Sequence, residues 1–77
     1  MAPVDPVLAS VLRRVRTERD LSIEAVAREA RISYTTLAKI EHAQTGPAWL
    51  TVRAIARALD LSMAELGRAV DQNSPES

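Results

Sequence analysis

The chain has 77 residues with no cysteine and one histidine, which excludes disulfides, cysteine-ligated zinc and a histidine-rich metal site. Its hydrophobic content of 47% indicates one small domain held together by packed apolar side chains, and no apolar run reaches the roughly 18 to 20 residues of a membrane span. The formal net charge of zero argues against a nucleic-acid partner, but the charges are unevenly placed, because residues 1–58 hold nine Lys or Arg against six Asp or Glu and residues 59–77 hold one against four.

The first predicted helix covers about residues 6 to 19. Asp5 is a favourable N-cap, and Pro6 fits the first helical turn because an N–H there would have no helical partner. Apolar residues then recur at helical spacing and should face the core: Leu8, Val11, Leu12 and Val15. Residues 1–5 are expected to form a flexible N-terminus.

Two short helices follow, over about residues 23–30 and 34–41, with Ser22 and Ser33 as their N-caps. Their apolar residues should be buried: Val26, Ala27 and Ala30 in the first, Leu37 and Ile40 in the second. Only about three residues join these helices, so they should cross at a steep angle, for which a small residue such as Ala27 is needed. That crossing would lift the first turn of the second short helix clear of the body.

The Thr-Gly-Pro sequence at residues 45–47 predicts a loop before a fourth helix over about residues 48 to 59. Its buried residues should be Val52, Ile55, Ala56 and Leu59. Trp49, the sole tryptophan, is expected to fill part of the core. Ser62 and Glu65 form a capping box that begins a fifth helix over about residues 63 to 70, and the polar residues 71–77 should be a disordered tail.

Residues 21–66, together with the first helix, resemble the helix-turn-helix domain of the phage-repressor type, the Cro/Xre family of DNA-binding regulators. The resemblance depends on these features in order: the Leu21-Ser22 entry, Ala27, the Ser33 cap, Ile40 followed by Glu41, Pro47 and the ending IARALDLSMAEL. It implies an all-α, compact five-helix bundle of the lambda-repressor-like DNA-binding type over residues 6–70. The second and third helices would form the helix-turn-helix.

The function implied is a sequence-specific DNA-binding transcriptional regulator, a repressor, whose third helix docks in the major groove of double-stranded DNA. The residues expected to contact bases lie on this helix: Tyr34, Thr35, Thr36, Ala38 and Lys39. A threonine methyl group can pack on a thymine methyl group, and a lysine can donate hydrogen bonds to guanine O6 and N7. Thr36 could instead bond a phosphate.

The residues expected to contact the DNA backbone surround the third helix: Arg13, Arg16, Ile23, Arg31, Ser33 and His42. Ser33 would hold a phosphate through its hydroxyl and through the free N–H groups of the helix start. In the family, an arginine at the place of Arg16 pairs with a glutamate at the place of Glu41 and is thereby directed towards the DNA backbone. The resemblance implies the same supporting pair here.

Three positions depart from the family pattern. Ile23 occupies a place where glutamine often contacts DNA, so one polar contact is missing or Ile23 packs on a sugar or methyl group. Arg31 and Ala43 occupy places where glycine is common. If Arg31 has a positive φ, this conformation should cost roughly 1 kcal/mol, which a phosphate contact could offset.

We expect a homodimer on a palindromic operator, because one such domain covers too little DNA for strong specificity. Domains of this type usually place two recognition helices in successive major grooves about 34 Å apart. Apolar residues of the fourth and fifth helices should form the interface: Leu50, Leu66 and Val70. The two residues on the fifth helix could equally belong to the core.

No enzymatic activity and no cofactor are expected, since the chain has no cysteine, one histidine and no glycine-rich phosphate loop. The alternative function is an antitoxin or adaptor whose bundle mainly binds a partner protein, and the neutral net charge keeps it open. A helix-turn-helix chain of this length resembles small autonomous repressors, including the controller proteins of restriction-modification systems. The first residues lack a secretory signal, so we expect a cytoplasmic protein without a membrane partner.

Overall fold

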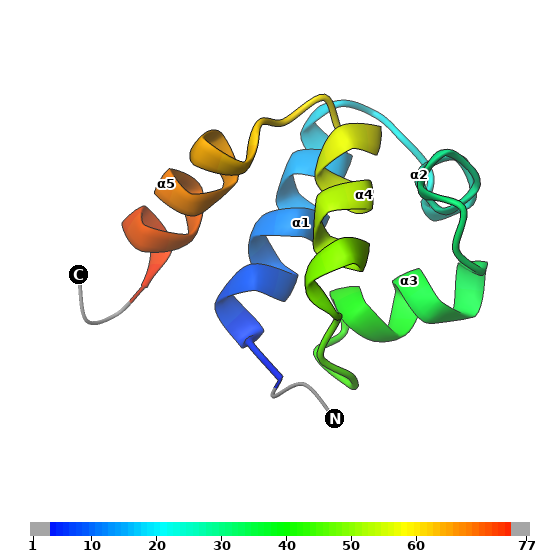
Figure 1. Cartoon of the computed structure of the whole chain (residues 1–77), viewed down its shortest axis with the longest axis horizontal. Coiled ribbons are helices and arrows are strands. Elements are labelled where there is room, and N and C mark those ends of the chain that lie inside the picture. Colours follow the sequence, from blue (N-terminus) through cyan, green and yellow to red (C-terminus); the bar gives the residue numbers. More distant parts are fainter. Residues whose placement is uncertain (1–3, 75–77) are drawn as a thin grey trace.

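The computed structural model describes residues 4–74, which form five α-helices and contain no strand. The helices are α1 (Pro6–Glu18), α2 (Ile23–Ala30), α3 (Tyr34–Glu41), α4 (Trp49–Ala58) and α5 (Met63–Asn73) (Figure 1). The predicted all-α, five-helix fold is confirmed. The parts of the predicted flexible N-terminus and disordered tail at residues 1–3 and 75–77 lie outside the described residues.

Serine and aspartate side chains cap four of the helices, as the sequence predicts. The Asp5 Oδ1 atom accepts the Val7 and Leu8 N–H groups, and Ser22 and Ser33 each accept an N–H from the first turn that follows. Ser62 and Glu65 form the predicted capping box at 2.9 and 3.0 Å. Hydrogen bonding of the Glu65 carboxyl with Ser62, first with its backbone N–H and then with its side chain, lowers the pKa of that carboxyl. Local chemistry therefore determines where these helices begin.

Helix α5 extends to Asn73, three residues beyond its predicted end at residue 70. Residues 71–73 therefore belong to α5, and their prediction as part of a disordered tail is wrong. The reason is a contact with α1: the Asn73 Oδ1 atom accepts a hydrogen bond from Arg14 Nη1 at 3.2 Å. The Asn73 Nδ2 atom also donates to the Ala69 carbonyl at 2.7 Å, within α5 itself.

Four non-glycine residues have left-handed backbone within two residues of a helix end: Asp20, Arg31, Ala43 and Asp60, with φ of 58°, 61°, 57° and 57°. After each, the next N–H bonds back across the last helical turn, as for Ile32 to the Ala27 carbonyl at 3.0 Å and Gln44 to the Lys39 carbonyl at 2.8 Å. The chain therefore makes its helix ends without glycine. Arg31 has the positive φ anticipated for the turn between α2 and α3.

We expect Ala43→Gly to raise the free energy of unfolding by about 1 kcal/mol, because glycine adopts the left-handed conformation without the steric cost of a Cβ atom. Urea denaturation measures this change. The control is Ser10→Gly in the exposed middle of α1, which should lower the same free energy by about 0.5 kcal/mol. Destabilisation by both substitutions would contradict the assignment of strain to Ala43.

The core combines buried residues from all five helices, and most of the predicted inward residues are confirmed. Those buried as predicted are Val11, Leu12, Val15, Val26, Ala27, Ala30, Leu37, Ile40, Val52, Ile55, Ala56 and Leu59. Leu8 is half-buried and packs against this core. The prediction for Trp49 is wrong, since 64% of this residue is exposed. Trp49 is the first residue of α4 and lies beside its buried face, where it lines a surface groove.

The helices place α3 and α5 on opposite sides of α4 (Figure 1). Helix α2 packs against both α3 and α4, and α5 packs mainly against α1. No helix in the described part of the chain is long and apolar enough to cross a membrane. Residues 4–74 also contain no cluster of three or more His, Cys, Asp or Glu residues suited to a metal ion.

Candidate nucleic-acid interface

Helix α3 is buried on one face and open to solvent on the other. Leu37 and Ile40 are almost completely buried, whereas Tyr34 is 57% exposed. The other predicted base-contacting residues lie on the open side as well: Thr35, Thr36 and Lys39 are exposed and Ala38 is half-buried. The first turn of α3 therefore presents an aromatic ring and two short hydroxyl side chains outward, followed by a lysine one turn later.

The Ser33 hydroxyl is largely used within the chain. It accepts the Thr36 N–H at 3.0 Å and forms a 2.7 Å hydrogen bond with the Thr36 hydroxyl. These two contacts stabilise the first turn of α3 and orient Thr36. The N–H groups of Tyr34 and Thr35 have no backbone acceptor at this helix start, so they are the groups through which an anion could be bound.

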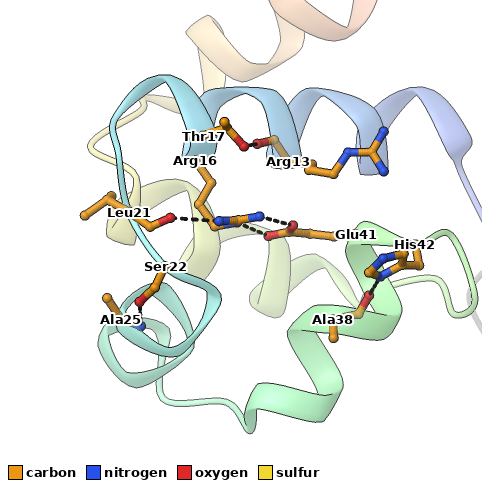
Figure 2. Close-up of polar contacts among 9 residues, drawn as sticks. All are labelled: Arg13, Arg16, Thr17, Leu21, Ser22, Ala25, Ala38, Glu41 and His42. Carbon is orange, nitrogen blue, oxygen red and sulfur yellow. Dashed lines mark hydrogen bonds and ion pairs between the residues drawn. The ribbon is translucent and has the colours of Figure 1, made fainter.

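A buried ion pair connects α3 to α1. The Arg16 Nε and Nη2 atoms donate to the two Glu41 carboxylate oxygens at 2.8 and 3.0 Å, so the pair is bidentate (Figure 2). The side chains of Arg16 and Glu41 are only 15% and 2% exposed. This contact confirms the predicted supporting pair and fixes the C-terminal end of α3 against the first helix.

The Arg16 guanidinium has a second partner residue, which was not predicted from the sequence. Its Nη1 atom donates to the Leu21 carbonyl oxygen at 2.7 Å (Figure 2). Leu21 lies in the connection between α1 and α2, so one side chain joins α1, the entry to α2 and the end of α3. No sequence signal identifies a backbone carbonyl as a partner, because every residue has one.

The remaining predicted backbone-contacting residues differ in accessibility. Arg13, Arg31, Ser33 and His42 are exposed, whereas Ile23 is half-buried and packs against the core. Arg13 and His42 lie on the same side of the Arg16–Glu41 pair, one on α1 and the other just after α3 (Figure 2). The His42 Nδ1–H group donates to the Ala38 carbonyl at 2.7 Å, which holds the ring against the end of α3. Contacts of these residues with DNA stay predictions.

The three predicted interface residues lie in different environments. Leu50 is 72% exposed on α4. Leu66 is only 3% exposed and packs in the core of its own chain, which is the alternative that the sequence left open for this residue, and a contact of Leu66 with a partner subunit stays a prediction. It is buried because α5 directs Leu66 towards the other helices, and Val70, one turn further on, is half-buried.

Comparisons with known proteins agree with this geometry. The sequence pattern of a family described as "Helix-turn-helix domain" matches residues 7–69. No curated protein matches the chain.

Three solved structures illustrate the similarity. The restriction-modification controller protein C.Esp1396I, a tetramer in complex with its natural 35-base-pair operator, superposes with a TM-score of 0.85 at 16% identity over 88% of this chain and 90% of that one. The controller protein C.AhdI from Aeromonas hydrophila superposes with a TM-score of 0.76 at 26% identity, over 79% of this chain and 92% of that one. An HTH_3 family transcriptional regulator from Vibrio cholerae superposes with a TM-score of 0.77 at 30% identity, over 92% of this chain but only 38% of that one.

Proposed function

The chain belongs to the helix-turn-helix domain family, and we propose that it is a sequence-specific DNA-binding transcriptional regulator that docks α3 in the major groove of its operator. The observation that carries this proposal is the division of α3 into two faces. Leu37, Ile40 and Glu41 are buried and hold the helix rigidly, while Tyr34, Thr35 and Lys39 extend into solvent. Such anchoring holds the exposed side chains of α3 in fixed positions, as a helix that reads base edges requires.

In this proposal the exposed residues of α3 contact base edges. Thr35 can pack its methyl group on thymine, and Lys39 can donate to guanine O6 and N7. Tyr34, Thr36 and Ala38 complete the base-contacting set, with the Thr36 hydroxyl already oriented by Ser33.

The free N–H groups at the start of α3 and the exposed side chains around it would hold the two phosphate backbones. This set consists of Arg13, Arg31, Ser33 and His42, with Ile23 in apolar contact with a sugar. Arg16 is mostly buried, so its part in DNA binding is to hold α3 in place and to offer its remaining N–H hydrogens to one phosphate.

We further propose that the protein acts as a homodimer on a palindromic operator and represses by occupying a promoter. C.Esp1396I, which has the same fold, assembles as a tetramer on its operator. Two copies of α3 about 34 Å apart would enter successive major grooves. A regulator of this kind acts on chromosomal DNA, so the proposal places the protein in the cytoplasm and assigns it no catalytic reaction.

The decisive experiment is selection of bound duplexes from a random DNA pool, at low and at physiological salt. We expect enrichment of a two-fold symmetric site whose half-sites are about one helical turn apart. The salt comparison separates specific binding from sequence-independent attraction to phosphates, which weakens steeply as salt rises. If a folded sample enriched no sequence, the alternative function of an antitoxin or adaptor that binds a partner protein would be favoured.

A further inference from the structure

Lys39 is the only lysine of the chain, and it is exposed on the open face of α3. Of the ten Lys and Arg residues, the other nine are arginines. An arginine makes the same contact with guanine O6 and N7, and its planar fork fits two acceptors better than an ammonium group does. Base reading alone therefore does not account for a lysine at this one position.

The chemical property that separates the two side chains is nucleophilicity. A lysine amine that has lost its proton attacks activated acyl groups, whereas the arginine guanidinium stays charged and does not react in this way. Lys39 carries the only side-chain amine of the chain. It is therefore the only side chain of this protein that can be acylated on an amine nitrogen.

The surroundings of Lys39 leave its amine accessible. The Lys39 side chain forms no ion pair with any carboxylate of residues 4–74. The only acidic residue of α3 is Glu41, which is buried and accepts two hydrogen bonds from Arg16. The Lys39 amine is therefore neither buried nor engaged by a carboxylate within the described part of the chain.

We infer that Lys39 is a modification site, at which an activated acyl group from an acyl phosphate or an acyl thioester is transferred to the side-chain amine. The neutral Lys39 nitrogen attacks the acyl carbonyl carbon, and a C–N bond forms as the C–O or C–S bond breaks. The phosphate or thiolate leaves with the electron pair, the proton lost from nitrogen goes to solvent, and nothing is oxidised or reduced. This inference rests on the proposed function and names a regulation of the reading face of α3.

Acylation removes the cation that the open face of α3 presents to DNA. The ammonium group with three donors becomes a neutral amide with one N–H, and the acyl group adds bulk where a base edge has to approach. The fold is unaffected, because α3 is anchored by Leu37 and Ile40 on its opposite face. The supply of activated acyl groups would therefore control operator binding without unfolding the protein.

Incubation of the full chain at neutral pH with acetyl phosphate, and separately with acetyl-coenzyme A, tests the inference. Mass measurement of the intact chain and of its peptides should show an acetyl group on Lys39 with at least one donor, and the reactive donor identifies the source. The selected duplex should slow this modification, because the proposed complex covers Lys39. The acetylated chain should bind that duplex roughly tenfold or more weakly than the untreated chain.

Lys39→Arg is the matched control, because it keeps the cation but carries no amine. Treatment with either donor should leave the affinity of this variant equal to its own untreated value. Lys39→Gln carries a neutral amide, so it should bind the duplex as weakly as the acetylated wild type. Lys39 is exposed, so the thermal unfolding midpoints of both variants should equal that of wild type.

Three results would overturn the inference: no acetyl group on Lys39 with either donor, an acetylated chain that binds as tightly as the untreated one, or the same loss of affinity in treated Lys39→Arg. If wild type enriches an operator but Lys39 stays unmodified, the modification site fails while the regulator stands. If Lys39 is modified but wild type enriches no sequence, the regulator fails while the modification site stands.

Discussion

Replacing Arg16 with alanine should lower the free energy of unfolding by about 3 to 5 kcal/mol, because it leaves the Glu41 carboxylate buried without a partner. The carboxylate would lose both hydrogen bonds from the guanidinium, and the Leu21 carbonyl would lose its donor as well. Small domains are stable by only about 5 to 15 kcal/mol, so this single change removes much of the total. Urea denaturation followed by circular dichroism measures the loss.

The chain supplies a matched control in an exposed ion pair. The closest distance between the Arg28 guanidinium and the Glu24 carboxylate is 2.9 Å, nearly the 2.8 Å of the buried pair, but both side chains are 73% exposed. Arg28→Ala should therefore change the free energy of unfolding by no more than about 0.5 kcal/mol. If Arg16→Ala and Arg28→Ala lowered the free energy of unfolding equally, the burial of Glu41 would not be the cause of the loss expected for Arg16→Ala.

A double substitution distinguishes the destabilisation caused by an unpaired buried charge from the stability that the ion pair itself contributes. Arg16→Met combined with Glu41→Leu removes both charges and keeps most of the buried volume. This variant should be far more stable than Arg16→Ala, because apolar replacement of a buried ion pair is often neutral or stabilising. It also tests the DNA-binding role of Arg16, since a stable double variant that binds DNA weakly would assign Arg16 a direct contact.

Lys39→Ala should weaken binding to the selected operator by about 1 to 3 kcal/mol and relax the base preference at one position of each half-site. Lys39 is exposed on the open face of α3, so its removal should leave the fold intact. Competition between the operator and a series of single-base variants measures both effects. An affinity equal to that of wild type, with unchanged preferences, would show that the reading face of α3 is placed wrongly.

Arg31→Ala is the matched comparison for a phosphate contact. It should weaken binding to all sequences about equally, and it should reduce the steepness of the plot of log affinity against log salt concentration by about 1. A change in base preference in place of this uniform loss would make Arg31 a base-reading residue.

The helices could be predicted from the sequence because their signals are local. The Asp5, Ser22, Ser33 and Ser62 caps bond N–H groups two or three residues away, so a short window contains the whole interaction. The apolar faces of α2, α3 and α4 also follow from spacing alone. The Arg16–Glu41 pair joins residues 25 positions apart, and it was predicted only through the resemblance to a known family.

Other features depended on contacts that no local pattern contains. Helix α5 continues to Asn73 because Arg14 on α1 contacts it, and Leu66 is buried because α5 is directed at the core. Trp49 is large and apolar, yet its position at the start of α4 leaves it on the surface. Hydrophobicity alone cannot separate a core residue from an exposed one at the edge of a buried face.

By itself, the sequence of this protein determined where its helices begin, which of their faces are apolar and that α3 carries an unusual outward set of Tyr34, Thr35 and Lys39. These properties depend on neighbours within one or two helical turns. Only the tertiary structure decided that Glu41 is buried, that Leu21 supplies a second partner for Arg16 and that Gly67 lines an open groove. The physical reason is that burial and pairing of a side chain are set by which other helices pack around it, and that packing joins residues far apart in the chain.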